Sequence, residues 1–205
     1  MLKTVFVKTP SPKAVDTREV LRYAGAKDDA AELIPMINSL SESSKDVFSY
    51  KVCYYAFRVF QKGENIDLGF ASVRSETLKK RLSGCDYALV FAATVGIGID
   101  RMILRAEHTS QSTALLLEAL GSERVEALCD AFCEEIKENS KEAGYGITGR
   151  FSPGYGDIPL SLQKDIFCVL DAPRKIGLTL NESLIMSPKK SVSAIIGFKN
   201  IKGEK

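Results

Sequence analysis

The chain has 205 residues, of which 45% are hydrophobic and 26% charged, so a single domain with a sizeable core is expected over residues 1–205. Its 28 Lys and Arg against 26 Asp and Glu give a net charge of +2, which excludes the unbalanced basic charge typical of a general nucleic-acid binder. The longest uncharged run, residues 87–99, is too short to span a bilayer, and the N-terminus lacks a signal-peptide core. A cytoplasmic protein without a membrane segment is therefore expected.

The N-terminal residues predict an arm followed by a helix. Two prolines interrupt residues 1–15, which should form an extended arm. Asp16 with Glu19 three positions later resembles a capping box. The helix that begins there should end at Gly25.

A second helix and a pair of strands should follow. Apolar residues at helical spacing predict a helix over residues 28–40, and Pro35 should kink it or divide it into two short pieces. Residues 42–45 should form a polar linker. The aromatic and β-branched run at residues 50–60 predicts a strand, with residues 66–73 returning as its antiparallel partner.

The middle of the chain predicts a central strand between helices. Residues 75–84 have the pattern of a short capped helix, and the nearly apolar residues 87–96 predict a strand buried on both faces. A helical pattern then continues to Gly144, first over residues 99–107 and then in a long amphipathic stretch. Gly121 within that stretch marks either close packing or a break.

The C-terminal part predicts a helix and a hairpin. The helix should cover residues 161–173 and stop at Pro173. The hairpin should turn at residues 187–190, and residues 199–205 should form a frayed tail. Strands and helices are mixed without strict βαβ alternation, so the favoured fold class is α+β with a mostly antiparallel sheet.

Three features that could carry chemistry are interpreted as structural. The glycines of FAATVGIGIDR suggest a dinucleotide fingerprint, but Arg101 stands where the third glycine is needed, which favours a simple strand-to-helix turn. The sequence offers no triad around His108, the only histidine, which lies near a helix boundary and is interpreted as a cap or surface residue. The five cysteines lack a CxxC spacing, and we expect buried free thiols and no metal site.

The segment RFSPGYGDIP, residues 150–159, is harder to explain by packing. Its prolines and glycines make a stiff loop whose backbone a ligand can approach closely. Arg150 provides a planar donor fork suited to a carboxylate. Tyr155 offers a ring for stacking on a base or for attracting a sulfonium cation. Residue chemistry alone leaves a ligand-binding loop and a rigid structural turn both open.

Residues Arg150–Tyr155 fit R-x-x-x-G-Y, the S-adenosylmethionine-binding signature of the reactivation domain of cobalamin-dependent methionine synthase. Residues 87–100, 125–138 and 177–198 also resemble segments of that domain, including its Ser-Val-Ser near the end. The chain is thus similar to this family over most of residues 87–198. The resemblance implies a C-shaped α+β fold with a bent, mostly antiparallel sheet and flanking helices.

The resemblance also implies a set of ligand contacts. Arg150 would pair with the methionine carboxylate, the backbone at Ser152 and Gly154 would read the adenine and nearby groups, and Tyr155 would line the site. Asp130 stands where the family has a carboxylate, usually Glu, near the amino group. No general base is implied, because the sulfonium already carries a good leaving group.

The function implied is that of a reactivation subunit rather than a complete enzyme. The chain would bind S-adenosylmethionine and dock on a separate methionine synthase chain that carries cobalamin, whose cob(II)alamin form is reduced by flavodoxin or a similar donor and remethylated. Two alternatives stay open: a non-catalytic docking or chaperone module for a corrinoid protein, and an independent small-molecule methyltransferase that uses the same loop.

Overall fold

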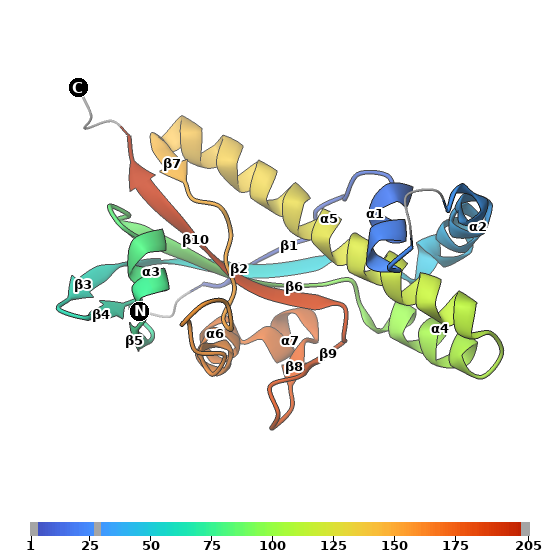
Figure 1. The fold of residues 1–205 in the computed structure, drawn as a ribbon. Coiled ribbons are helices and arrows are strands. Elements are labelled where there is room, and N and C mark those ends of the chain that lie inside the picture. The colour runs from blue at the N-terminus through green and yellow to red at the C-terminus, as the bar shows by residue number, and fades with distance from the viewer. Residues whose placement is uncertain (1–3, 27–29, 202–205) are drawn as a thin grey trace.

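The structure, a computed structural model, describes residues 4–26 and 30–201. Its centre is a five-stranded sheet in the order β1-β2-β6-β10-β7 (Figure 1). The strands are β1 (Phe6–Lys8), β2 (Lys51–Arg58), β6 (Tyr87–Thr94), β7 (Tyr145–Ile147) and β10 (Ser191–Asn200). Each pairing in this sheet is antiparallel, and helices cover both of its faces. The predicted α+β class with a mostly antiparallel sheet is confirmed.

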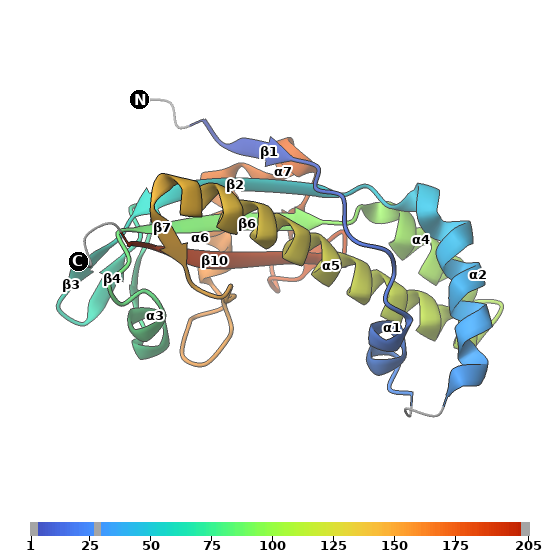
Figure 2. The same cartoon turned by 90° about the horizontal axis from the view of Figure 1, so that it is seen from above.

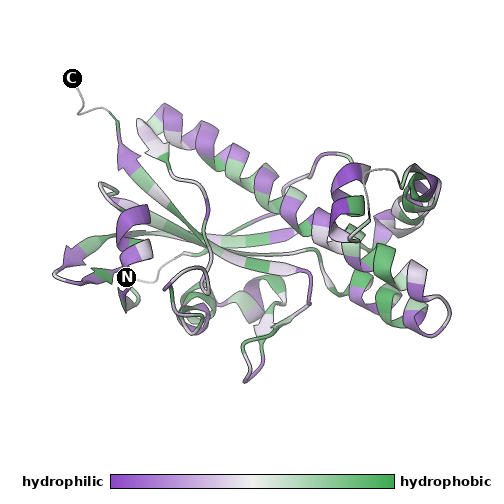
Figure 3. Ribbon diagram, viewed as in Figure 1, coloured by the Kyte–Doolittle hydropathy of each residue, from purple (hydrophilic) through white to green (hydrophobic). Residues whose placement is uncertain are grey.

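β6 is the inner strand, and every residue after Tyr87 in it is buried. It pairs along its whole length with β2 on one side and with β10 on the other. Figure 3 shows this apolar run as a green band through the sheet. The predicted central strand is therefore confirmed. Because both neighbours run antiparallel to β6, the glycine turn that follows belongs to no parallel βαβ unit, and Gly98 serves packing: a Cβ there would lie 2.3 Å from the Val47 carbonyl oxygen.

One face of the sheet is covered by four helices. They are α1 (Thr17–Tyr23), α2 (Ile34–Ser44), α4 (Ile97–Glu107) and α5 (Gln111–Ala143). In Figures 1 and 2, α5 runs along the sheet and continues beyond its end, where α1, α2 and α4 gather around it. Phe91 of β6 packs on Phe132 of α5 with ring centroids 5.0 Å apart, at the centre of a first hydrophobic core.

The opposite face packs on shorter elements. They are α3 (Glu76–Arg81), α6 (Leu162–Leu170), α7 (Ala172–Ile176), the small sheet β3 (Phe60–Lys62), β4 (Asn65–Asp67) and β5 (Ser72–Arg74), and the pair β8 (Thr179–Leu180) and β9 (Met186–Ser187). Ile166 and Leu170 of α6 are fully buried against β6, and Leu78 of α3 joins the same second core. The sheet thus separates two cores.

Helix ends follow the local capping signals. Asp16 caps α1 by accepting from the Arg18 and Glu19 N–H groups, as predicted, but its own N–H donates to Glu123 rather than to Glu19. Ser75 caps α3 through the Leu78 N–H. These caps satisfy N–H groups that a helix cannot pair internally.

The N-terminal arm is attached to α5 by a buried ion pair. Glu123 and Arg124 are each 5% exposed, and the guanidinium donates to both carboxylate oxygens at 2.5 and 2.6 Å. Arg124 also donates to the Lys13 carbonyl at 2.8 Å, and Glu123 accepts from the Asp16 N–H. Further along the arm, Lys8 pairs with Glu135. The extended arm therefore packs along α5, with β1 as its paired segment.

Both prolines expected to disturb helices begin them instead. A 3₁₀ turn (Ala31–Leu33) precedes α2, and Pro35 lies in the first turn of α2, where no N–H partner is lost. Pro173 likewise begins α7 and does not end α6. Residues 42–45 are not a linker, since α2 continues to Ser44 and a second 3₁₀ turn follows it. The start of the expected helix at residue 28 lies outside the described residues.

The predicted strand pairings near both sheet edges are wrong. Residues 66–73 overlap β4 and β5, and β4 pairs with β3 and with β5. Of the predicted strand at residues 50–60, only Phe60 pairs with this segment, while β2 pairs with β1 and β6. β9 pairs with β8, so no hairpin joins it to β10. Lys199 and Asn200 are not frayed, because they pair with β7 as part of β10. Residues 202–205 lie outside the described part.

α5 is one unbroken helix of 33 residues that ends at Gly144 in the left-handed conformation. Gly121 therefore marks close packing: a Cβ there would lie 3.0 Å from Lys190 Cγ. Cys53 and Cys129 are buried free thiols, as expected, but Cys168 is exposed. Within residues 4–26 and 30–201, no helix is long and apolar enough to cross a membrane.

Candidate functional site

The RFSPGYGDIP segment is a compact loop joined to the edge of the sheet. Phe151 exchanges backbone hydrogen bonds with Ile195 of β10, at 3.1 and 2.8 Å. The Gly154 N–H donates to the Ile158 carbonyl at 2.9 Å, and the Ile158 side chain is buried in the second core. The loop is therefore rigid, and one backbone group expected to read a ligand, the Gly154 N–H, is already engaged.

Asp157 fixes the far end of the loop to α3. Its carboxylate accepts from the Ser75 hydroxyl at 2.6 Å and from the Glu76 and Thr77 N–H groups at 2.7 and 3.0 Å. Hydrogen bonds from Ser75 and Thr77 hold the pKa of Asp157 well below its usual range. Gly156, at φ +60°, approaches so closely that a Cβ would lie 2.7 Å from Thr77 Oγ1. The glycine is thus required where the loop meets α3.

Arg150 is held by two carboxylates of α5. Its Nη2 donates to Glu126 at 2.5 Å and to Asp130 at 3.0 Å. Burial by itself would lower the pKa of Arg150, but the hydrogen bond to Glu126 and the surrounding charges outweigh it and raise the pKa. Both contacts use Nη2, so Nε and Nη1 are not engaged by these carboxylates and can donate to a ligand.

A cavity of about 550 Å³ adjoins this ion pair. Its walls come from the loop, α3, α5, α6 and β10, and its lining includes Arg150, Ser152, Tyr155, Glu126, Gln163 and Ser193. Its size lies within the range of small-molecule sites. Three of the five predicted ligand contacts therefore lie together here: Arg150, Ser152 and Tyr155.

The other two predicted contacts lie apart from this cavity. Asp130 lines two neighbouring hollows of about 350 and 410 Å³ and reaches the site through its bond to Arg150. Gly154 lines none of these hollows. Its Cβ position faces Leu160 at 3.2 Å, so its contribution is to the turn of the loop.

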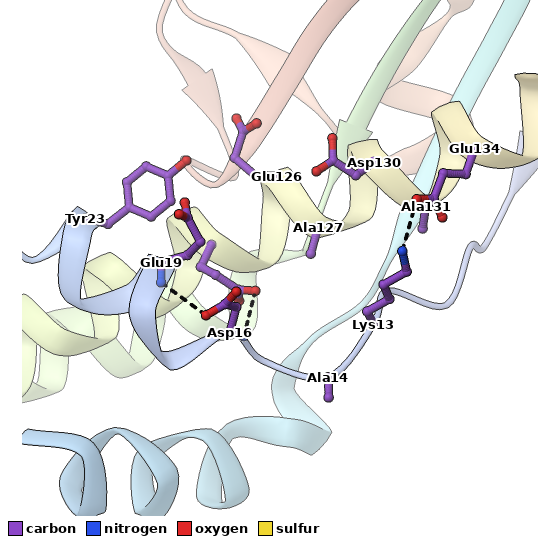
Figure 4. Close-up of a pocket in the computed structure, with 11 residues that line it drawn as sticks. Lys13, Ala14, Asp16, Glu19, Tyr23, Glu126, Ala127, Asp130, Ala131 and Glu134 are labelled. Atoms are coloured by element: carbon purple, nitrogen blue, oxygen red, sulfur yellow. Dashed lines mark hydrogen bonds and ion pairs between the residues drawn. The ribbon is translucent and has the colours of Figure 1, made fainter. Parts of the chain in front are cut away.

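The 350 Å³ hollow between α1 and α5 is acidic, and most of its carboxylates form ion pairs within the chain. Figure 4 shows Glu126, Asp130 and Glu134 spaced along α5, with Asp16 and Glu19 on the facing helix and its cap. Glu134 pairs with Lys13 at 3.0 Å, and Glu19 pairs with Arg22 at 2.6 Å. The carboxylates therefore hold the arm, α1 and Arg150 in place.

No metal-binding group emerges around the site. Among the described residues, no cluster of three or more His, Cys, Asp or Glu side chains is arranged to hold a metal ion. Cys129 and Cys133 lie on α5 near Arg150, and burial raises the pKa of both thiols, that of Cys133 to about 11. They are therefore protonated and poorly nucleophilic at neutral pH.

Sequence reasoning missed several polar residues of the 550 Å³ cavity, among them Glu126, Gln163 and Ser193. Glu126 lies one helical turn before Asp130, so the four-residue spacing could have indicated that both reach the same neighbour. Gln163 on α6 and Ser193 on β10 had no comparable signal, because only the tertiary fold brings these elements to one cavity.

Comparison with known proteins identifies the family and the fold. Residues 70–201 match the family described as "Vitamin B12 dependent methionine synthase, activation domain". The fold is similar to that of the MetH reactivation domain in its crystal structure bound to AdoHcy, with a TM-score of 0.61 and 17% sequence identity over 90% of this chain and 70% of that one. At this identity the similarity shows the fold alone. No curated protein sequence matches the chain.

Proposed function

Since the chain belongs to the family of vitamin B12-dependent methionine synthase activation domains, we propose that it binds S-adenosylmethionine in the 550 Å³ cavity and supports reductive remethylation of cob(II)alamin on a methionine synthase partner. The observation that carries the proposal is Arg150 at the cavity wall, held by Glu126 and Asp130. The related MetH domain was crystallised with AdoHcy, the product that S-adenosylmethionine leaves after methyl transfer.

The residues present fit this ligand at its charged end. A guanidinium binds a carboxylate through paired hydrogen bonds, so Arg150 would hold the methionine carboxylate. Glu126 at the cavity, with Asp130 beside it on α5, would attract the ligand ammonium group. Tyr155 is 71% exposed at the mouth of the cavity, where its ring can attract the sulfonium.

The proposed role of the chain is to bind and orient the methyl donor. Cobalamin, carried by the partner, supplies the metal that accepts the methyl group once a flavodoxin-like protein or another donor has provided an electron. Because the sulfonium is its own leaving group, the chain needs no general base, and its contribution is proximity and alignment. A cytoplasmic location, where the partner and the electron donor would be available, is part of the same proposal.

Titration calorimetry with S-adenosylmethionine tests the proposal on the wild-type chain, Arg150→Ala and a control, Arg74→Ala. Arg74 is an exposed arginine of β5 that pairs with Glu64 outside the cavity. We expect saturable binding to the wild type and the control, and at least tenfold weaker binding to Arg150→Ala, which corresponds to about 1.4 kcal/mol.

The role with a partner is tested separately by transfer of a labelled methyl group from S-adenosylmethionine to partner-bound cobalamin under reducing conditions. Transfer that requires both this chain and Arg150 supports the function. Absence of ligand binding, with or without the cobalamin-carrying partner, would overturn it. Methyl transfer to a small molecule without cobalamin would favour an independent methyltransferase.

A further inference from the structure

Two residues that line the 550 Å³ cavity carry buried side-chain oxygens without hydrogen-bond partners. Among the described residues, three buried side-chain oxygens make no hydrogen bond: Asp100 Oδ1, Gln163 Oε1 and Ser193 Oγ. Gln163 and Ser193 both belong to this cavity. Buried polar groups in native proteins are nearly always paired, so two exceptions at one cavity call for an explanation.

Ser193 differs from its neighbour in the same Ser-Val-Ser segment. Ser191 and Ser193 lie two residues apart on β10, so their side chains point to the same face of the sheet. The Ser191 hydroxyl lies 2.8 Å from the Pro188 carbonyl and 2.9 Å from Thr94 Oγ1. Ser193 is 1% exposed, and its hydroxyl has no hydrogen-bond partner. The partly buried Ser191 is thus paired within the chain, whereas the fully buried Ser193 is not.

Gln163 of α6 likewise has a buried side-chain oxygen without a hydrogen-bond partner. It occupies the first turn of that helix and its side chain is buried, with 7% of the residue exposed. Its backbone N–H donates to the Leu160 carbonyl, while the side-chain carbonyl oxygen accepts nothing. An uncharged acceptor and a hydroxyl, carried on two different elements, thus line the same cavity as Arg150.

We propose that Gln163 Oε1 and Ser193 Oγ bind a neutral hydrogen-bond donor on the nucleoside half of S-adenosylmethionine, an inference that rests on the proposed function. The charged amino-acid end of this ligand has charged partners in Arg150 and Glu126. Its adenosyl end is neutral and carries donors, namely the adenine N6 amino group and the ribose hydroxyls. Gln163 Oε1 can accept from either donor.

The remaining lining supports this assignment. Apolar side chains share the walls with the two orphan oxygens: Phe151, Ile158, Met186 and Val192. Apolar surface beside fixed polar groups suits a flat base or a sugar, which needs orientation rather than charge neutralisation. The lining of the cavity thus combines charged side chains, Arg81, Glu126 and Arg150, with neutral polar ones that include Gln163 and Ser193.

The test compares Gln163→Met, Ser193→Ala and the control Ser191→Ala by thermal melting and by titration with S-adenosylhomocysteine. Removing an unpaired buried polar group should stabilise the free protein, so we expect Gln163→Met and Ser193→Ala to melt at least as high as the wild type. Each should bind about 3- to 10-fold more weakly. Ser191→Ala should instead melt lower, because it deprives Thr94 and Pro188 of a partner.

Three ligand analogues identify the donor. If the N6 amino group is bound, S-inosylhomocysteine should lose affinity for the wild type but not for Gln163→Met. If a ribose hydroxyl is bound, the 2′- or 3′-deoxy analogue should instead lose affinity for the wild type but not for Gln163→Met. Wild-type affinity in both site variants, or melting temperatures that fall as in Ser191→Ala, would overturn the inference while leaving the proposed function standing. Failure of the wild type to bind S-adenosylhomocysteine at all would overturn both.

Discussion

Arg150 and Glu126 form the shortest ion pair at the cavity, with Nη2 2.5 Å from the carboxylate oxygen, while Asp130 lies 3.0 Å from the same nitrogen. The arginine expected to hold a ligand carboxylate is therefore oriented by the chain's own acids before any ligand arrives. Such orientation reduces the conformational entropy that a long side chain loses on binding.

The two ion pairs of Arg150 should contribute unequally to stability. Glu126 is about a third exposed and Asp130 two thirds, so solvent screens the second pair more strongly. Double-mutant cycles with Arg150→Met, Glu126→Gln and Asp130→Asn in urea unfolding should give a coupling free energy of about 1 kcal/mol for the first pair and below about 0.5 kcal/mol for the second. Equal couplings would contradict this ranking.

The buried pair of Glu123 and Arg124 should dominate the attachment of the N-terminal arm. Glu123→Ala leaves a buried guanidinium without its carboxylate and should lower the free energy of unfolding by about 3 to 5 kcal/mol. The control is Glu134→Ala, which removes an exposed pair with Lys13 and should change stability by less than about 0.5 kcal/mol. Similar losses in both variants would show that solvent reaches the inner pair.

Asp157 should make the loop sensitive to acid. Its folded-state pKa lies below the unfolded value of about 3.9, so the carboxylate stabilises the fold above that pH and loses this contribution as the pH falls toward the folded pKa. The melting temperatures of wild type and Asp157→Asn should differ by a constant amount above about pH 5, and the difference should shrink progressively as the pH falls below about 4 toward the folded pKa. A gap that persists at low pH would assign the effect to the shape of the side chain.

Gly156 should be intolerant of a side chain. Alanine there would hold a positive φ and press on Thr77, so Gly156→Ala should lower the free energy of unfolding by about 1 to 2 kcal/mol and weaken ligand binding through displacement of the loop. Gly149→Ala is the matched control, because its Cβ would meet nothing within 4 Å. Calorimetry and urea unfolding measure both effects, and an unchanged Gly156→Ala would show that the loop end is free to move.

Signals that act within a few residues predicted much of this fold. The Asp16 cap, the apolar run of β6 and the glycine end of α5 are local features, and each lies where the sequence indicated. Prolines were misjudged because the same residue can end one helix or begin the next, as Pro173 does. The partners of β9 and β10 were missed because pairing depends on segments far away in the chain.

The residues of the candidate site were likewise predicted only where a local sequence signal marked them. Arg150 and Tyr155 stand out because an arginine and an exposed tyrosine have no packing role in a stiff turn. Gln163 has an ordinary helical context, and Ser193 an ordinary strand context. Their unpaired oxygens become visible only when α6 and β10 are brought together.

Because the sheet separates the interior into two cores, a ligand that contacts both layers should change their local unfolding. Glu126 extends from α5, which packs on one core, while Gln163 extends from α6, which packs on the other, and both line the same cavity. A small molecule that contacts both side chains therefore connects the two layers that pack on opposite faces of the sheet. Ligand binding should therefore slow amide hydrogen exchange in α5 and α6 together, because local unfolding of either helix would then break contacts with the ligand.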